Sequence, residues 1–401
     1  MYSILVALIA LSGWTAQPVE LATVRPMGEE RAGFVTTLGR DTVALESFTR
    51  TGSHVDGDIV VRVPGTVLCH YSVDMSPTGT VTRTLLDIKP LGTSEVHARR
   101  VTLEFGRDSV RVTVDSSGHK QTATRALEKA EFPLFMTGFG SSFGLYSSLG
   151  MYELFLSHVS PTVNDTVAVR SVDMASGRVS TRRFIRRTPT LVDVDYFGIL
   201  WTHLTSDSAG HVMSADASAT TEKTQSQRTA FLDVPRAADA FAAADRAGKG
   251  IGVASPNEIE RDAVGGQTVV ATYGSPRKRG RVILGNVVPY DRIWRTGANE
   301  ATVLVFDHDL SIAGTTLPAG AYSIWTLPER DGTVQLIINK QHGQWGTDYD
   351  PAQDVVRIPM QVTVAPTPSE NMAISINGSG NASQLRISWD TFVWSVPVAL
   401  K

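Results

Sequence analysis

The sequence predicts a mainly β protein in two parts: an N-terminal curved antiparallel sheet packed on a helix, and a C-terminal antiparallel β-sandwich or jelly-roll-like domain. Three observations support this prediction. A hairpin phrase recurs in the first half, one apolar helical segment interrupts it, and short strands bounded by turn residues fill the second half. The 401 residues favour two domains, and a hydrophobic content of 42% is enough to fill two cores.

The recurring phrase is an alternating strand, an Asp, a few small residues, a Gly and a second strand. Gly adopts the positive φ that tight hairpins need, and Asp bonds its own backbone in the turn. The irregular spacing of the phrases favours one long antiparallel sheet over a propeller or solenoid. An echo of 41–48 in 165–172 indicates an internal duplication or a reused hairpin design. The phrase occurs at residues 71–84, 112–124, 170–183 and 204–216.

Two helices are expected. In the segment 141–158, apolar residues recur at helical spacing and cover most of the circumference, which is typical of a buried helix. We expect it against the concave face of the sheet. A second helix starts near Val234, with Asp233 as its cap and Pro235 in its first turn, and connects the two parts. The predicted boundaries are 1–16 for a signal peptide, 20–233 for the first domain, 234–253 for the helical connector and 254–401 for the second domain.

The N-terminus is typical of a secretory signal peptide. Residues 4–11 form an apolar run that small residues follow, and the run is too short to span a bilayer, which needs about 20 residues. A cleaved chain would start between Gly13 and Val19. The alternative is a buried first strand. No later segment is apolar enough for a transmembrane span, so an extracytoplasmic location, periplasmic or secreted, is expected.

Charge and cysteine content exclude several classes of protein. The formal net charge of -3 argues against a nucleic-acid or anionic-membrane partner. The one basic run, residues 275–281, is interpreted as a solvated loop. Cys69 is the only cysteine, so no disulfide forms within the chain, and its strand position indicates a small buried hydrophobe.

The stretch "WRTGANEAT", residues 294–302, is the first candidate site. It combines Trp294, Arg295, Asn299 and Glu300 around a flexible Gly-Ala. One interpretation is a polar pocket for a small anion or sugar, in which the guanidinium of Arg295 donates hydrogen bonds. The other is structural: Arg295 and Glu300 form an ion pair, and Trp294 covers the core.

The stretch "NKQHGQWGTDYD", residues 339–350, is the second candidate. Its Trp345, Tyr349 and Asp350 would make an aromatic shelf with an acceptor, as carbohydrate sites use. The alternative is a packed Ω-loop.

The second half resembles a known family. The runs "YGSPRKRGRVILGNVVPYDRIWRTGANEATVLVF", "LPAGAYSIWTLP", "IINKQHGQWGTDYDPAQDVVRIPM" and "LRISWDTFVWSVPV" are similar to the bacterial domain of unknown function 2911, over about residues 254–398. The resemblance implies an exported β-rich domain and brings no established activity. The first half resembles no family. Its expected outline is similar to periplasmic lipoprotein carriers, by architecture alone.

No catalytic residue, metal ligand or cofactor is predicted. Residues 140–144 satisfy the string G-x-S-x-G, but the alternating strands and helices of such hydrolases are absent, so we interpret the string as a chance match. The histidines are scattered singly, and the glycine-rich segments lack a phosphate-loop Lys.

The sequence therefore predicts an exported bacterial protein, not an enzyme, that binds a small-molecule, sugar or lipid ligand or an envelope partner. It leaves the oligomeric state open. The alternative is a hydrolase acting on sugars or esters, with Glu300 and Asp350 as candidate acid and base. A purely structural module of the envelope is a third possibility.

Overall fold

The computed structural model describes residues 29–401 with short gaps. The predicted signal peptide and the G-x-S-x-G string lie outside the described residues. The gaps are residues 78–79, 94–95, 127–130, 135, 138–145, 157–161, 174–178, 197–199, 219, 221–222 and 380–381.

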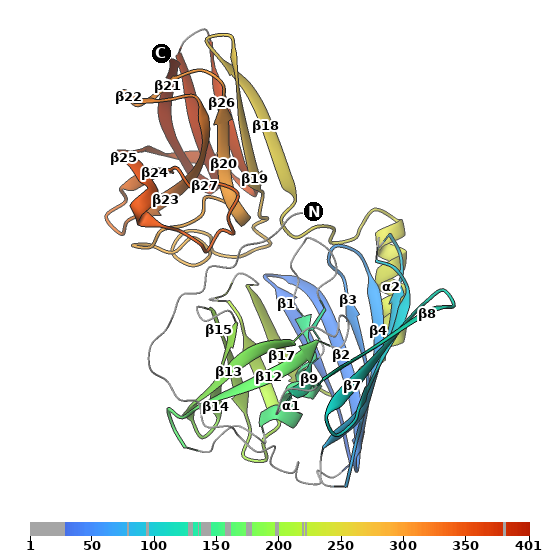
Figure 1. Cartoon of the computed structure of the whole chain (residues 1–401). Helices are drawn as coiled ribbons and strands as arrows, with labels where there is room; N and C mark the ends of the chain where they lie inside the picture. Colours follow the sequence, from blue (N-terminus) through green and yellow to red (C-terminus); the bar gives the residue numbers. More distant parts are fainter. Residues whose placement is uncertain are drawn as a thin grey trace.

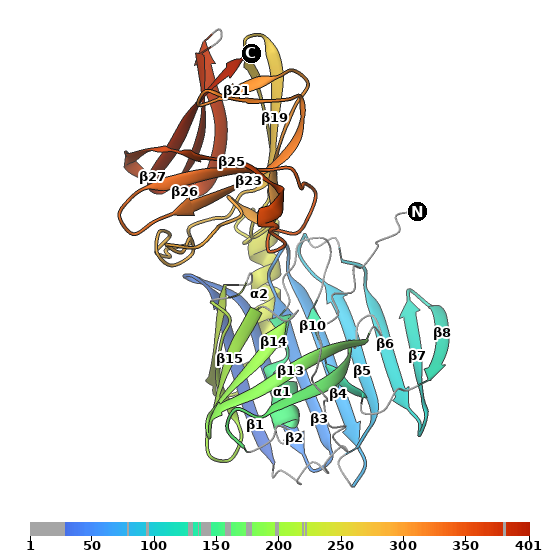
Figure 2. The ribbon, with the colours of Figure 1, turned by 60° about the vertical axis from the view of Figure 1, so that its left-hand side comes forward.

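The described N-terminal part is dominated by one curved sheet of 15 strands (Figures 1 and 2). Its order is β8-β7-β6-β5-β4-β3-β2-β1-β17-β16-β15-β14-β13-β12-β9, and only the β9–β12 pair is parallel. The prediction of one long antiparallel sheet is thus confirmed. The strands are β1 (Glu30–Leu38), β2 (Asp41–Thr51), β3 (His54–Val61), β4 (Val67–Met75), β5 (Val81–Pro90), β6 (Arg99–Phe105), β7 (Ser109–Ser116), β8 (His119–Ala126), β9 (Glu131–Leu134), β12 (Thr166–Asp173), β13 (Val179–Thr188), β14 (Leu191–Tyr196), β15 (Leu200–Ser206), β16 (Val212–Asp216) and β17 (Thr224–Thr229).

All four repeated phrases form hairpins between neighbouring strands. They join β4 to β5, β7 to β8, β12 to β13, and β15 to β16. In the β7–β8 turn, Gly118 has φ +84° and its N–H donates to the Asp115 carboxylate at 3.0 Å. Local turn chemistry therefore accounts for the part of the sheet that the sequence predicted best.

The helix α1 (Leu149–Leu156) begins later than the predicted residue 141. Before it, β11 (Tyr146–Ser147) pairs with β10 (Met136–Thr137) as a two-stranded sheet, so the helix begins only at Leu149. The carboxylate of Glu46 on β2 accepts hydrogen bonds from the first helical N–H groups, those of Leu149 at 2.8 Å and Gly150 at 3.3 Å. These are the groups that a helix leaves without internal partners, so Glu46 stabilises its N-terminus.

The helix α2 (Val234–Arg246) follows the sheet in sequence. Asp233 caps it by accepting from the N–H of Arg236 at 3.1 Å, and Pro235 lies in the first turn, as predicted. Its buried residues Val234 and Ala238 pack in a cluster with Val60 of β3. The connector helix is therefore packed on the N-terminal sheet.

The C-terminal part contains two antiparallel sheets that contribute to one buried cluster. The six-stranded sheet has the order β18-β19-β20-β23-β24-β25, and the four-stranded sheet has the order β22-β21-β27-β26. The elements are β18 (Asn257–Val264), β19 (Gln267–Gly274), β20 (Ala298–Phe306), β21 (Leu310–Ile312), β22 (Thr315–Leu317), β23 (Gly320–Pro328), β24 (Val334–Asn339), the 3₁₀ helix η1 (Pro351–Gln353), β25 (Asp354–Pro359), β26 (Gln361–Ser379) and β27 (Ala382–Leu400).

The stretch "ATVLVFDHDLSI", residues 301–312, has turn residues between two apolar runs, which is typical of a hairpin, but its two strands do not pair with each other. β20 pairs with β19 and β23, whereas β21 pairs with β22 and β27 in the other sheet. The turn at Asp307–Asp309 carries the chain between sheets, and its position is held by Asp309, whose carboxylate accepts from the N–H of Ala319 at 3.0 Å. A tight turn between two strands does not by itself show that they pair.

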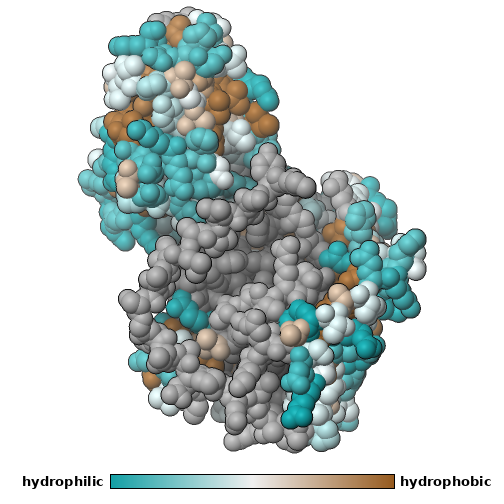
Figure 3. Space-filling view, in the orientation of Figure 1, coloured by the Kyte–Doolittle hydropathy of each residue, from teal (hydrophilic) through white to brown (hydrophobic). Residues whose placement is uncertain are grey.

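The surface of the C-terminal part in Figure 3 is mostly hydrophilic, with smaller groups of hydrophobic side chains. Among the exposed large apolar residues are Ile259, Val362 and Val364. Such scattered apolar residues are normal on a surface that faces water.

The thiol of Cys69 on β4 is fully buried, and its burial raises its pKa well above the ordinary value. Since only the thiolate is nucleophilic, we expect no reaction with an aromatic disulfide reagent in the folded protein. One equivalent should react after unfolding in guanidinium. The release of the coloured thiol product measures this, and rapid labelling without denaturant would contradict the burial.

Candidate functional site

The two polar stretches predicted as candidate sites lie side by side. Glu300 pairs with Trp345 in an isolated antiparallel bridge, and the N–H of Gly346 donates to the carbonyl of Asn299 at 3.0 Å. The loop before η1 therefore lies along the start of β20. Glu300 is exposed, and Trp345 and Asn299 are partly buried.

The predicted ion pair between Arg295 and Glu300 is wrong. Among the described residues the Arg295 side chain has no carboxylate partner, and its Nε has no hydrogen-bond acceptor. Asn299 has φ +64° at the start of β20, and Glu300 is exposed although Thr302 is fully buried, so burial does not alternate here. Arg295 instead lies against Gly346, where an added Cβ would be 2.0 Å from its Cδ.

Trp294 is buried in the C-terminal core. It stacks on Trp389 with ring centroids 6.3 Å apart and meets Trp394 edge-on at the same distance. Its backbone pairs with Thr326 of β23. These contacts account for Trp294 as a packing residue.

Tyr349 and Asp350 have well-defined local partners. The hydroxyl of Tyr349 donates to Asp354 at 2.5 Å, and its ring meets that of Trp325 at 5.0 Å. Burial, followed by the hydrogen bond to Asp354, raises the pKa of Tyr349 to about 12. Asp350 is exposed and caps η1 by accepting from the N–H of Ala352 at 2.9 Å. The binding role of both residues stays a prediction.

The basic run at residues 275–281, which we call the basic loop, is not the solvated loop expected from its composition. Ser275 is 4% exposed and its hydroxyl donates to the carbonyl of Met372 at 2.7 Å. Arg279 is also 4% exposed, and its N–H donates to the Glu370 carboxylate at 2.8 Å. The basic loop is thus bonded to the middle of β26, where the pairing register with β27 shifts.

The other side of the basic loop contacts the N-terminal sheet. The turn between β1 and β2 brings the N–H of Arg40 to 3.0 Å from the carbonyl of Arg279. Gly39 in this turn has φ +62°, and a Cβ there would lie 2.4 Å from the same carbonyl. The approach therefore requires glycine. An ion pair of 2.5 Å between Arg279 Nη1 and Asp41 joins the two parts.

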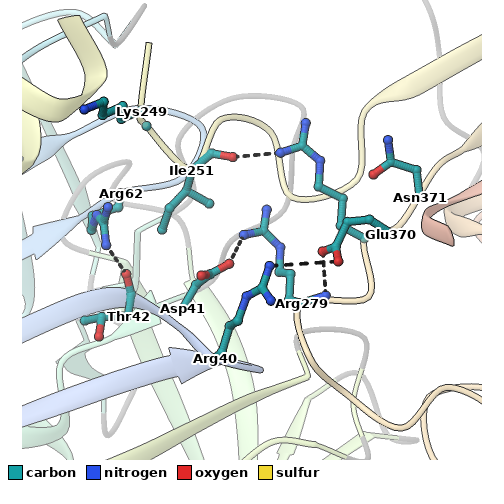
Figure 4. Close-up of a pocket in the computed structure, with 11 residues that line it drawn as sticks. Arg40, Asp41, Thr42, Arg62, Lys249, Ile251, Arg279, Glu370 and Asn371 are labelled. Atoms are coloured by element: carbon teal, nitrogen blue, oxygen red, sulfur yellow. Dashed lines mark hydrogen bonds and ion pairs between the residues drawn. The ribbon is translucent and has the colours of Figure 1, made fainter. Parts of the chain in front are cut away.

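A pocket with a volume of about 520 Å³ lies at this junction, and we call it the junction pocket (Figure 4). It is lined by residues from both parts and from the segment after α2. Five basic side chains face two acidic ones. The basic residues are Arg40, Arg62, Lys249, Arg277 and Arg279, and the acidic residues are Asp41 and Glu370.

The guanidinium groups of the junction pocket are held by backbone carbonyls as much as by carboxylates. Arg62 donates to the carbonyl of Thr42 at 2.7 Å (Figure 4). Arg277 donates to the carbonyl of Ile251 at 3.2 Å. Burial lowers the pKa of Arg62 against the opposing effects of Asp245 and Asp41. The Nε and Nη2 atoms of Arg279 are buried without a partner in the described structure.

None of the residues that line this pocket was predicted as a site residue. The only signal was the density of charge in the basic loop, and a loop of that composition is usually solvated. Its burial depends on the turn at Gly39, which lies far away in the sequence.

The described residues include no group of His, Cys, Asp or Glu arranged to hold a metal ion. They also include no helix long and apolar enough to cross a membrane.

The fold and the junction define a two-part, mainly β protein whose charged pocket lies between its parts. Residues 255–398 match the model of a family described as Protein of unknown function (DUF2911), which confirms the resemblance in the C-terminal part. No family model matches the N-terminal half. A search of the curated proteins finds no match.

Among solved structures, the chain is similar to a DUF1089 family protein from Pseudomonas aeruginosa. The identity is 11%, the TM-score is 0.30, and the match covers 43% of this chain and 89% of that chain. A TM-score this low supports no conclusion about fold or function.

Proposed function

We propose that this is an exported bacterial protein that binds a small polar ligand, without catalysis, in the junction pocket. The proposal includes a signal peptide at residues 1–16 and an extracytoplasmic location. It takes the N-terminal part as a curved sheet packed on α1 and the C-terminal part as a β-sandwich. Envelope partners or lipids that carry the same polar group are included in the proposed ligand class.

One observation carries the proposal: Arg279 is almost fully buried, lines a pocket of about 520 Å³ and has two nitrogens without a partner among the described residues. The pocket volume lies within the range of about 300–1,000 Å³ that is usual for small-molecule sites. An unpaired buried donor costs about 1–3 kcal/mol, so the arrangement is stabilised when a ligand supplies an acceptor.

The test fills the pocket and asks whether binding is lost. Asn371 is exposed on β26 and lines the pocket, so Asn371→Trp should obstruct it. Asn377→Trp places the same side chain on the same strand outside the pocket and is the matched control. An envelope extract of the host should raise the melting temperature of the wild type and of Asn377→Trp, but not that of Asn371→Trp.

Native mass spectrometry of the same three proteins then identifies the bound molecule. We expect an added mass on the wild type and on Asn377→Trp that is absent from Asn371→Trp. Equal thermal shifts in all three proteins, or no shift in any of them, would contradict binding in the junction pocket.

A further inference from the structure

Four more basic side chains extend the charge of the junction pocket. They are Arg281, at the end of the basic loop, Lys223, just before β17, and Arg292 and Arg295, in the segment before β20. We call them the cationic strip. Lys223, Arg281 and Arg295 are partly buried, and Arg292 is exposed.

Arg281 is the member of the cationic strip that lies beside the junction pocket. Its guanidinium donates to the carbonyls of Lys278 at 3.1 Å and Arg277 at 2.5 Å. Its side chain also lies against the β1–β2 turn, where its Cγ would be 3.0 Å from a Cβ at Gly39. Burial and the neighbouring charge of Arg279 lower its pKa to about 10, against the opposing effects of Glu370 and Asp41.

Lys223 lies among positive charges. Burial is the largest cause that lowers its pKa to about 8, and the charges of Arg295, Arg281 and Arg292 lower it further. Among the described residues, Lys223, Arg292 and Arg295 form no ion pair with a carboxylate. Burial alone lowers the pKa of Arg295 to about 10, and its Nε has no acceptor among the described residues either.

Another part of the same chain shows how this fold pairs buried arginines. Arg50 and Arg228 each form ion pairs with both Glu30 and Glu153. Positive charges brought together without counterions repel one another, and partial burial strengthens that repulsion. The absence of such pairing in the described cationic strip therefore indicates that a counterion comes from outside the chain.

We infer that the junction binds a small ligand with at least two anionic groups, one at Arg279 in the junction pocket and a second at Arg281, Lys223 and Arg295. This inference rests on the proposed function and specifies its ligand. The guanidinium fork matches the oxygens of phosphate and carboxylate groups, so multiply phosphorylated or polycarboxylated molecules are the chemical class. Arg40 lines the pocket, and its side chain is 68% exposed. This side chain can change rotamer to admit the ligand.

The experiment measures binding of tripolyphosphate by isothermal titration calorimetry to the full chain at low ionic strength. Inorganic phosphate serves as the ligand with one anionic group, citrate as the polycarboxylate, and maltose as the neutral compound. The variants are Arg279→Lys, in the pocket, and Arg295→Gln, in the cationic strip. Arg100→Gln is the control, because Arg100 is exposed on β6 and pairs with Asp87 away from the junction.

We expect tripolyphosphate to bind more tightly than phosphate, and maltose not to bind. Each junction variant should weaken tripolyphosphate roughly 10- to 100-fold, which is the loss expected for a hydrogen bond to a charged group. Arg100→Gln should bind like the wild type. Because Arg279→Lys alters a buried side chain, its melting temperature and circular dichroism are compared with those of the wild type, and Arg295→Gln supplies an independent test.

Three results would overturn the inference. The first is tripolyphosphate binding that is equal in all variants, or no binding at all. The second is that phosphate binds as tightly as tripolyphosphate and that Arg295→Gln has no effect on either. The junction would then bind one anionic group and not two. The third is binding to phosphatidylglycerol vesicles without binding of free tripolyphosphate, which indicates a membrane surface. If Asn371→Trp still loses the native ligand in any of these cases, the proposed function stands and the ligand is of another class.

Discussion

Replacing Arg50 with Ala is expected to lower the free energy of unfolding of the N-terminal part by about 3–5 kcal/mol, the cost of leaving a buried charge without its partner. The side chain of Arg50 is 1% exposed and that of Glu153 on α1 is fully buried, and their ion pair is 2.8 Å long. Arg228 also pairs with Glu153, so part of the negative charge stays compensated in the variant.

The loss in Arg50→Ala should depend on pH. Burial, the largest cause, already raises the pKa of Glu153, and Arg228 and Arg50 oppose that effect. A carboxyl with a raised pKa in the folded state binds its proton more tightly than in the unfolded state. Its contribution is therefore fully present below the unfolded pKa of about 4.3 and is lost as the pH rises through the folded pKa. We expect the penalty of Arg50→Ala to shrink as the pH falls.

Urea unfolding followed by far-ultraviolet circular dichroism measures the loss, and hydrogen exchange assigns it to β2 and α1. Arg100→Ala is the control, because the side chain of Arg100 is 59% exposed and an exposed pair contributes about 0–1 kcal/mol. A loss in Arg50→Ala no greater than in Arg100→Ala would show that the buried network does not hold α1 to the sheet.

The features that the sequence predicted are those set by neighbouring residues. The β7–β8 hairpin follows from Asp115 and Gly118 within one turn, and the start of α2 follows from Asp233 and Pro235. Such signals act over a few positions, so they can be recognised without the fold.

The features that were missed depend on distant partners. Arg279 is buried because Asp41 and the turn at Gly39 reach it from the other part of the chain. The Arg295–Glu300 pair was expected from their spacing, but the fold places Arg295 against Gly346 and leaves Glu300 exposed. The two polar stretches around Glu300 and Trp345 were recognised separately, and only the fold brings them together.

Replacing Trp389 with Ala is expected to lower the free energy of unfolding of the C-terminal part by about 3–5 kcal/mol, the usual cost of truncating a buried aromatic side chain. Trp389 on β27 is fully buried and stacks on Trp294 with ring centroids 6.3 Å apart. Its Nε1 donates to the carbonyl of Glu370 at 3.2 Å. Because the carboxylate of Glu370 accepts from the N–H of Arg279, the truncation should also loosen the junction pocket.

Two variants separate packing from hydrogen bonding at this position. Trp389→Phe keeps an aromatic ring against Trp294 but removes the N–H, so it should cost less than Trp389→Ala. Val364→Ala on β26 is the exposed control, since its side chain is 78% exposed and surface changes stay within about 0.5 kcal/mol. Guanidinium unfolding followed by circular dichroism measures all three. If Trp389→Ala cost no more than Val364→Ala, the stacked tryptophans would not be the centre of this core, and the link from Trp389 through Glu370 to Arg279 would carry no energy.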